Sequence, residues 1–164
     1  MPIRFSLLDN AKKKRLIEKL SYFGIEKIPY LLLKSGEERV VAFSGSMTRE
    51  EIYILMENLN VESIGLYFGK EFVDEARLSI DMLHFLGKQI KGNVIYLTAT
   101  QKDDWFLGKQ VELNEEQKTE AEEKKIRGFI ALKFGEDFIG TGKLMQDGRT
   151  ISSFLPKERR VRSQ

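Results

Sequence analysis

The chain has 164 residues, of which 41% are hydrophobic and 32% charged, and this composition suits a globular protein of one ordinary domain or two small ones. It contains no cysteine and one histidine, which excludes disulfides, cysteine-ligated zinc, iron–sulfur clusters, thiol nucleophiles and histidine-rich metal sites. The net charge of +2 hides an uneven distribution, because residues 138–164 carry six cationic and two anionic side chains, whereas residues 112–125 carry three cationic and six anionic ones.

No apolar run approaches the roughly 20 residues needed to cross a bilayer. The beginning of the chain, MPIRFSLLDNAKKKR, places its basic cluster after the apolar stretch, which is the reverse of a secretory signal. We therefore expect a cytoplasmic protein without a membrane partner.

A helix is predicted early in the chain, within DNAKKKRLIEKLSYFG (residues 9–24). Asp9 is a suitable N-cap, and Gly24 can end the helix. Three apolar residues share one face at helical spacing: Leu16, Ile17 and Leu20.

A β-hairpin and a second helix are predicted next. The apolar runs YLLLK (30–34) and RVVAF (39–43) flank the turn SGEE. Thr48 and Glu51 have the spacing of a capping box, which opens a helix. Four apolar residues are expected on its buried face: Ile52, Leu55, Met56 and Leu59.

The first half ends with a short strand, SIGLYFGK (63–70), broken by Gly69. The following ARLSIDMLHFLGKQ is ambiguous, because ARLSI suits a strand and DMLHFLGKQ suits a short helix closed near Gly87. His84 lies next to Phe85 on this apolar segment, and we expect it to be a packed, hydrogen-bonded core residue.

The pattern changes near residue 91, where we place a domain boundary. NVIYL (93–97) predicts a strand, Thr100 is expected to cap a short helix, and Gly108 is its predicted C-cap. The polar stretch from Asn114 to Lys125 is expected to be a mobile loop or a solvated, partly helical excursion.

The rest of the chain reads as β-structure. Three apolar runs are separated by tight turns at GED and at Asp147-Gly148, and Pro156 stops the last one: GFIALKF, FIGTGKLM and TISSFL. Short strands joined in this way predict a compact barrel.

The glycines of this region do not form a nucleotide-binding loop. Gly135 and Gly140 have the spacing of a P-loop, but Thr141 and Gly142 follow where lysine and serine or threonine are needed, and the next element is a strand. The Rossmann fingerprint fails as well, because no helix follows. Gly140 and Gly142 are interpreted as relieving tight packing in the barrel; the alternative is that they accept the backbone of a ligand.

The segment LPKERRVR (155–162) concentrates basic charge after the last predicted strand. If Phe154 and Val161 anchor this segment, its arginines form a fixed patch, whereas a flexible basic tail is the alternative. Guanidinium groups suit phosphate oxygens, and Phe154 or Trp105 would stack a base if exposed. We expect both aromatic side chains to be buried in the core.

Four segments in this order resemble proteins with a pre-PUA domain followed by a PUA domain, in particular small ribosome-biogenesis factors. The segments are SIGLYFGK (63–70), ARLSIDMLHFL (76–86), DDWFLGKQV (103–111) and RGFIALKFGEDFIGTGK (127–143). The resemblance implies an α+β protein in which a small α/β pre-PUA domain (residues 1–90) precedes a PUA-type β-barrel (residues 91–164). The acidic stretch from Glu112 to Lys125 departs from the compact PUA pattern.

The ending DGRTISSFLPKERRV is also similar to the PUA-like tails of Sun-type RNA cytosine-5 methyltransferases. Those enzymes need catalytic cysteines and an S-adenosylmethionine domain, which this chain lacks. By this resemblance the chain is at most a stand-alone relative of their RNA-binding region.

The resemblance implies which residues contact RNA. PUA domains hold RNA with the glycine loop after their first helix and with the strands at their C-terminal end, which correspond here to Gly108 and Lys109 and to Arg149, Lys157, Arg159 and Arg160. The two remaining cations of residues 138–164, Lys143 and Arg162, complete the expected RNA-binding set.

The leading hypothesis is a non-catalytic RNA-binding protein without cofactor or metal, which assists ribosomal RNA maturation or subunit assembly and recruits protein partners through its N-terminal domain. One alternative is an adaptor in an RNA-modification or ribosome-assembly complex with little RNA binding of its own. Another is a small enzyme that uses Asp103 and Asp104. Adjacent helical residues point in different directions, so this pair is better interpreted as charge near a helix N-terminus.

Overall fold

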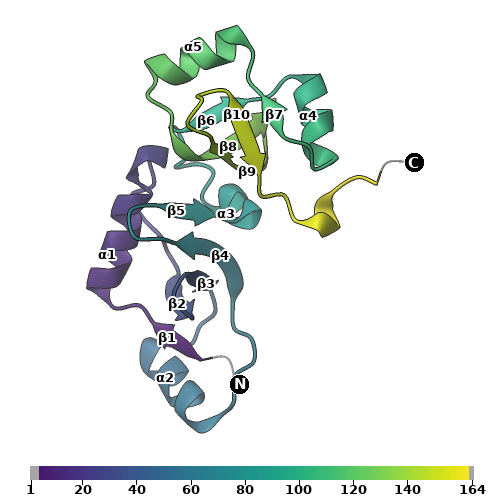
Figure 1. Ribbon diagram of the computed structural model, residues 1–164. Helices are drawn as coiled ribbons and strands as arrows, with labels where there is room; N and C mark the ends of the chain where they lie inside the picture. Colours follow the sequence, from purple (N-terminus) through teal and green to yellow (C-terminus); the bar gives the residue numbers. More distant parts are fainter. Residues whose placement is uncertain (1–3, 163–164) are drawn as a thin grey trace.

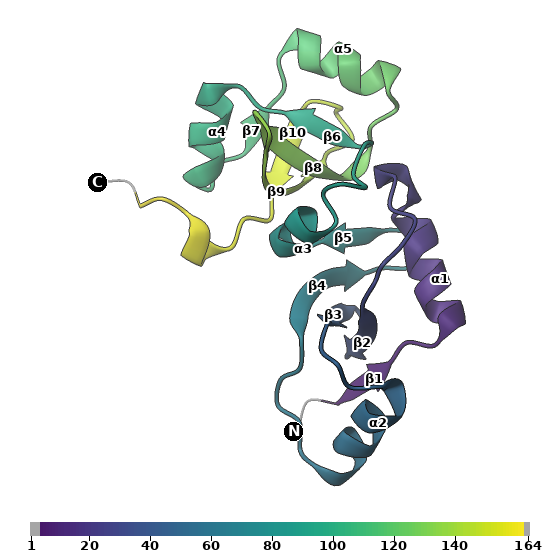
Figure 2. The same cartoon turned by 180° about the vertical axis from the view of Figure 1, so that it is seen from behind.

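The computed structural model describes residues 4–162 and shows a mixed α+β protein with two five-stranded sheets arranged end to end (Figures 1 and 2). The first sheet is an antiparallel meander whose strands follow chain order: β1 (Phe5–Leu7), β2 (Leu31–Ser35), β3 (Arg39–Phe43), β4 (Leu66–Glu71) and β5 (Ala76–Leu78). Its helices are α1 (Asn10–Lys19), the 3-10 turn η1 (Ser21–Phe23), α2 (Arg49–Asn58) and α3 (Ile80–Phe85).

The second sheet has the strand order β6-β8-β9-β10-β7 and curls into a half-barrel. Its strands are β6 (Val94–Tyr96), β7 (Val111–Glu112), β8 (Gly128–Phe134), β9 (Asp137–Leu144) and β10 (Thr150–Ser153). Only the β6–β8 pair among these is parallel. The accompanying helices are α4 (Ala99–Phe106), α5 (Glu115–Glu123) and the 3-10 turn η2 (Lys157–Arg159).

The first sheet is covered on both faces because its central strands alternate between two apolar clusters. Leu32 and Val40 face the cluster that contains Leu16 and Leu20 of α1. The neighbouring residues Leu33 and Val41 face the opposite cluster, which contains Ile52 of α2. This two-residue alternation is the expected geometry of a pleated strand.

The two sheets meet through a shared core and one buried polar contact. The side chains of Ala131 (β8) and Phe138 (β9) belong to the core of the first half. The hydroxyl of Thr141, which is buried, donates a hydrogen bond of 2.8 Å to the carbonyl of Leu78 in β5. All strands of the first sheet precede residue 91 and all strands of the second follow it; the division into two domains stays a prediction.

Local sequence signals for the early helices are confirmed in part. Asp9 accepts a hydrogen bond from Lys12 as the N-cap of α1, and Thr48 and Glu51 form the predicted capping box. Gly24 has a left-handed backbone but ends η1, because α1 itself ends at Lys19. The prediction of a buried Leu59 is wrong, since its side chain is 61% exposed beyond the end of α2.

Two further predictions are corrected. The N-cap of α4 is Thr98 rather than Thr100, because Thr98 forms a reciprocal capping box with Gln101. His84 is exposed on α3 and is not a core residue.

The acidic stretch folds as the helix α5, so the prediction of a partly helical excursion is confirmed and that of a loop is wrong. Asn114 caps it and shares a capping box with Gln117. The amide of Gln117 also donates to the carbonyl of Tyr96 and to the side chain of Gln101, both at 2.8 Å. The amide contacts therefore attach this charged helix to β6 and α4.

Candidate nucleic-acid interface

The C-terminal segment, residues 154–162, folds back onto the end of α4 (Figures 1 and 2). The backbone N–H of Val161 donates to the carbonyl of Phe106 at 2.7 Å. The ring of Phe154 packs against Phe129 of β8, with ring centroids 5.6 Å apart. Phe154 therefore anchors the segment as expected, whereas Val161 does so through its backbone and leaves its side chain exposed.

The guanidinium of Arg160 lies against the backbone of Gly108, the second residue after α4. Gly108 has φ +80°, and a Cβ built on it would lie 2.7 Å from Cδ and 2.8 Å from Nε of Arg160. Arg160 Nε also donates to the carbonyl of Leu155 at 3.2 Å. Only glycine combines this left-handed conformation with so close an approach, which explains its place here.

The other cations near this contact are partly paired. Arg159 of η2 reaches α3 and forms a 3.1 Å ion pair with Asp81, and Lys109 lies 3.6 Å from Asp104. Lys157 and Arg162 are exposed and form no ion pair within residues 4–162. We call the following five cations the C-terminal basic surface: Lys109, Lys157, Arg159, Arg160 and Arg162.

Two predicted site residues are engaged elsewhere. Lys143 of β9 forms a 2.9 Å ion pair with Glu75 and lies 4.8 Å above the ring of Phe129, at the junction between the sheets. Arg149 forms an ion pair with Glu115 in the first turn of α5. Both side chains are thus neutralised by the fold rather than gathered with the C-terminal cations.

Asp147 orders the turn that carries Arg149. Its carboxylate accepts hydrogen bonds from the hydroxyl of Thr150 at 2.6 Å and from the backbone N–H groups of Thr150 and Arg149 at 2.8 Å. These bonds, led by that of the Thr150 hydroxyl, lower the pKa of Asp147 to about 2. The turn predicted at Asp147 and Gly148 is therefore confirmed.

A cleft opens between the two sheets beside Arg159. Its volume is about 150 Å³. The side chains that give it chemical character are Tyr67, Arg77, Ser79, Asp81, Phe154 and Arg159. We call this site the junction cleft, because its walls come from β4, β5 and α3 on one side and from β9 and the C-terminal segment on the other.

Arg77 and Tyr67 were not predicted as site residues from the sequence. The guanidinium carbon of Arg77 lies 4.3 Å from the ring centroid of Phe154, and its Nη2 donates to the hydroxyl of Tyr67 at 3.4 Å. The sequence pattern apolar–Arg–apolar indicates an exposed arginine, because Arg77 stands between the buried Ala76 and Leu78 in a three-residue strand. Such alternation places the arginine on the opposite face from the core.

The two candidate stacking aromatics have different environments. Trp105 is fully buried, as expected, and its Nε1 donates to the carbonyl of Ile139 at 3.2 Å. The expectation that Phe154 is buried is wrong, since 38% of it is exposed at the cleft. Phe154 alone of this pair therefore presents a ring to a ligand.

The glycines of β9 serve packing, which confirms the preferred interpretation. A Cβ on Gly140 would lie 2.6 Å from Cζ2 of Trp105, and one on Gly142 would lie 2.5 Å from Cγ2 of Ile151. A Cβ at either position would therefore meet a protein side chain, and packing explains why both residues are glycine.

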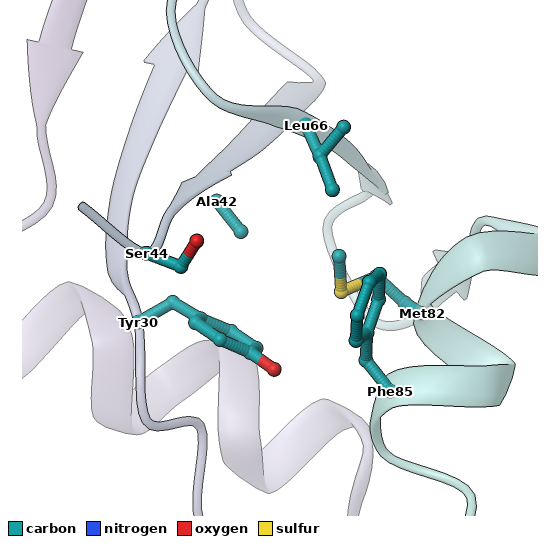
Figure 3. Close-up of a pocket in the computed structure, with 6 residues that line it drawn as sticks. All are labelled: Tyr30, Ala42, Ser44, Leu66, Met82 and Phe85. Atoms are coloured by element: carbon teal, nitrogen blue, oxygen red, sulfur yellow. The ribbon is translucent and has the colours of Figure 1, made fainter.

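Two other features are poor candidates for a binding site. Tyr30, Ala42, Ser44, Leu66, Met82 and Phe85 line the hollow in Figure 3, whose volume is about 30 Å³ and corresponds to about one water molecule. Asp103 and Asp104 lie in the second half of α4, not at its N-terminus as predicted. They pair with Lys102 and Lys109 respectively and do not converge on a reaction site.

Comparison with protein-family models and with curated protein sequences found no match to this chain. Within residues 4–162, no helix combines the length and apolar character that a membrane span requires.

Proposed function

We propose that this protein is a non-catalytic RNA-binding protein of the pre-PUA plus PUA type, which assists ribosomal RNA maturation or the assembly of a ribosomal subunit. Residues 1–90 would form the pre-PUA domain and recruit protein partners in the cytoplasm. Residues 91–164 would form the PUA domain and bind RNA without a cofactor or a metal.

The contact between Arg160 and Gly108 carries the proposal. The family resemblance assigns RNA binding to the glycine after the first PUA helix and to cations near the C-terminus, regions separated by about 50 residues of this sequence. In the structure Arg160 lies against that glycine, and the backbone of the neighbouring Val161 is bonded to Phe106 of α4. Arginine and lysine on a rigid scaffold bind phosphate oxygens and position the nucleic acid backbone.

The proposal is tested by the salt dependence of binding of the full chain to single-stranded RNA. If the C-terminal basic surface neutralises five phosphates, the logarithm of affinity should fall against the logarithm of salt concentration with a slope of about −3.5. The double substitution Lys157→Gln/Arg162→Gln should reduce the magnitude of that slope by about 1.4.

A matched control removes the same charge from cations outside the surface. The substitution Lys143→Gln/Arg149→Gln should leave the slope near its original value, because both side chains lie outside the C-terminal basic surface, where they pair with Glu75 and Glu115. Equal slopes for the two double variants, or no binding at low salt, would contradict the proposal.

A second candidate function, a protein-interaction adaptor, is favoured by the outer face of α2. Tyr53 and Ile54 of α2 and Leu59, the residue after it, are each more than half exposed, and exposed apolar side chains occur at protein contact sites. The two functions are separable, because an adaptor would retain a stable protein complex after the C-terminal cations are removed and would bind no RNA.

A further inference from the structure

We infer that the junction cleft binds an unstacked base of single-stranded RNA, so that the first sheet contributes to the RNA-binding site. This inference rests on the proposed function and deepens it by naming the class of RNA. It assigns a ligand-binding role to Tyr67, Arg77 and Phe154, which lie outside the C-terminal basic surface.

Three cations form a row across the first sheet toward the cleft. Arg39 of β3 is the cross-strand partner of Lys70 in β4, and Lys70 is the partner of Arg77 in β5. Cross-strand partners project on the same face of a sheet, where like charges destabilise one another. Of these three cations, only Lys70 forms an ion pair within the residues that the structure describes, with Glu38 at 3.2 Å. An anionic ligand along this row would offset the repulsion.

Aromatic rings alternate with these cations. The guanidinium carbon of Arg39 lies 5.3 Å from the ring centroid of Tyr67, and that of Arg77 lies 4.3 Å from the centroid of Phe154. Arg77 and Tyr67 are further joined by their 3.4 Å hydrogen bond. Alternating guanidinium and aromatic planes are the surfaces on which unstacked bases of single-stranded nucleic acid are held.

The size and polarity of the cleft suit one flat ring. Its volume of about 150 Å³ equals that of an engineered protein cavity that binds benzene, so a base ring fits. The guanidinium of Arg159, which is paired with Asp81, lies at its wall. A guanidinium donates hydrogen bonds to the acceptors on a base edge.

The cleft is also continuous with the C-terminal basic surface. Arg159 belongs to both. The next residue, Arg160, contacts Gly108. A single strand whose phosphates lie along the C-terminal cations could therefore place a base in the cleft. A duplex could not, because its bases stay stacked, and an acidic peptide would use the cations but not the aromatic rings.

The experiment compares three ligands on the full chain at one salt concentration: a single-stranded adenosine oligomer, the same oligomer in a duplex, and a single strand of equal length without bases. The single strand with bases should bind tightest, and the base-free strand should bind at least about 5-fold more weakly. Phe154→Leu keeps apolar contact with Phe129 but loses the aromatic face. It should weaken binding of the adenosine oligomer by about 5- to 150-fold and leave the base-free strand unaffected.

Tyr96→Leu is the matched control, because Tyr96 is an exposed aromatic residue below a cation, Lys133 at 5.8 Å, in the second sheet. It should leave the affinity unchanged. Phe154→Trp provides a second measurement that does not depend on lost affinity. Its tryptophan fluorescence, corrected for the signal of the buried Trp105, should be quenched when the adenosine oligomer binds.

The outcomes separate the inference from the proposed function. Equal binding of the base-free strand, no effect of Phe154→Leu and no quenching in Phe154→Trp would overturn the cleft inference and leave RNA binding in place. Failure of the wild-type protein to bind any RNA at low salt would overturn both. Competition by poly-glutamate as strong as that by the adenosine oligomer would show a general polyanion surface and would overturn the base-binding role.

Discussion

Arg160 lies across the backbone of Gly108, so close that a methyl group on residue 108 would overlap its side chain. We expect Gly108→Ala to displace Arg160 and to weaken binding of single-stranded RNA. The substitution should also destabilise the protein by about 1–2 kcal/mol, because φ at residue 108 is +80°. Binding titrations and urea unfolding measure the two effects separately.

Gly135→Ala is the control for backbone strain. Gly135 has φ +60°, and nothing lies within 4 Å of a Cβ placed there. This variant should lose a similar amount of stability and keep its affinity for RNA. An equal loss of affinity in both alanine variants would show that the contact with Arg160 has no role in binding.

The Arg159–Asp81 ion pair restrains a cation of the proposed binding surface. Both side chains are partly exposed and their atoms lie 3.1 Å apart. Asp81→Asn should therefore release Arg159 and tighten RNA binding by up to about five-fold, the equivalent of an exposed ion pair. Glu120→Gln also removes one carboxylate and releases Lys124 from its ion pair, far from the proposed binding surface. It should have little effect on RNA affinity. Similar gains in both variants would mean that net charge alone sets affinity.

Thr141 holds the two sheets together through its hydroxyl. We expect Thr141→Val to lower the free energy of unfolding by about 1–3 kcal/mol, because the buried 2.8 Å hydrogen bond to the carbonyl of Leu78 is lost. Thr141→Ser retains the hydroxyl and should preserve this bond. Thr119→Val removes a comparable bond on the exposed helix α5 and should have a smaller effect. Urea unfolding of the three variants tests this order.

The low pKa of Asp147 makes the β9–β10 turn sensitive to acid. Its folded-state pKa of about 2 lies below the ordinary value of 3.8, so the ionised carboxylate stabilises the native state above pH 3.8. This stabilisation should be lost as the pH falls toward 2. Asp147→Asn should therefore destabilise the protein most near neutral pH, and the difference from wild type should shrink between about pH 4 and about pH 2. A difference independent of pH would contradict the assignment.

Features specified by neighbouring residues could be predicted from the sequence. The segment GFIALKF coincides with β8, and the hairpin and the capping box at Thr48 lie where their residues indicate. The error at α4 was avoidable. Thr98 is followed three residues later by Gln101, which can close a capping box, whereas Thr100 is followed by Asp103.

The junction cleft could not be predicted in this way, because its walls are distant in sequence. Arg77 and Phe154 meet only when β5 packs beside the end of β10, and no local pattern encodes that contact. The same applies to Lys143 and Arg149, whose net charge is visible in the sequence but whose partners, Glu75 and Glu115, are set by tertiary packing. Charge counts therefore overstate how many cations face a ligand.

The contacts of residues 154–162 have a consequence for the order in which the protein is completed. This segment is synthesised after Asp81 and Phe106, to which it attaches, and domains of a growing chain fold from the N-terminal end. Lys157, Arg159 and Arg160 can take up their places only after α3 and α4 have formed. A misfolded chain would carry the same charges without this arrangement. The basic surface therefore forms only in the folded protein, and misfolded chains would compete poorly for its ligand.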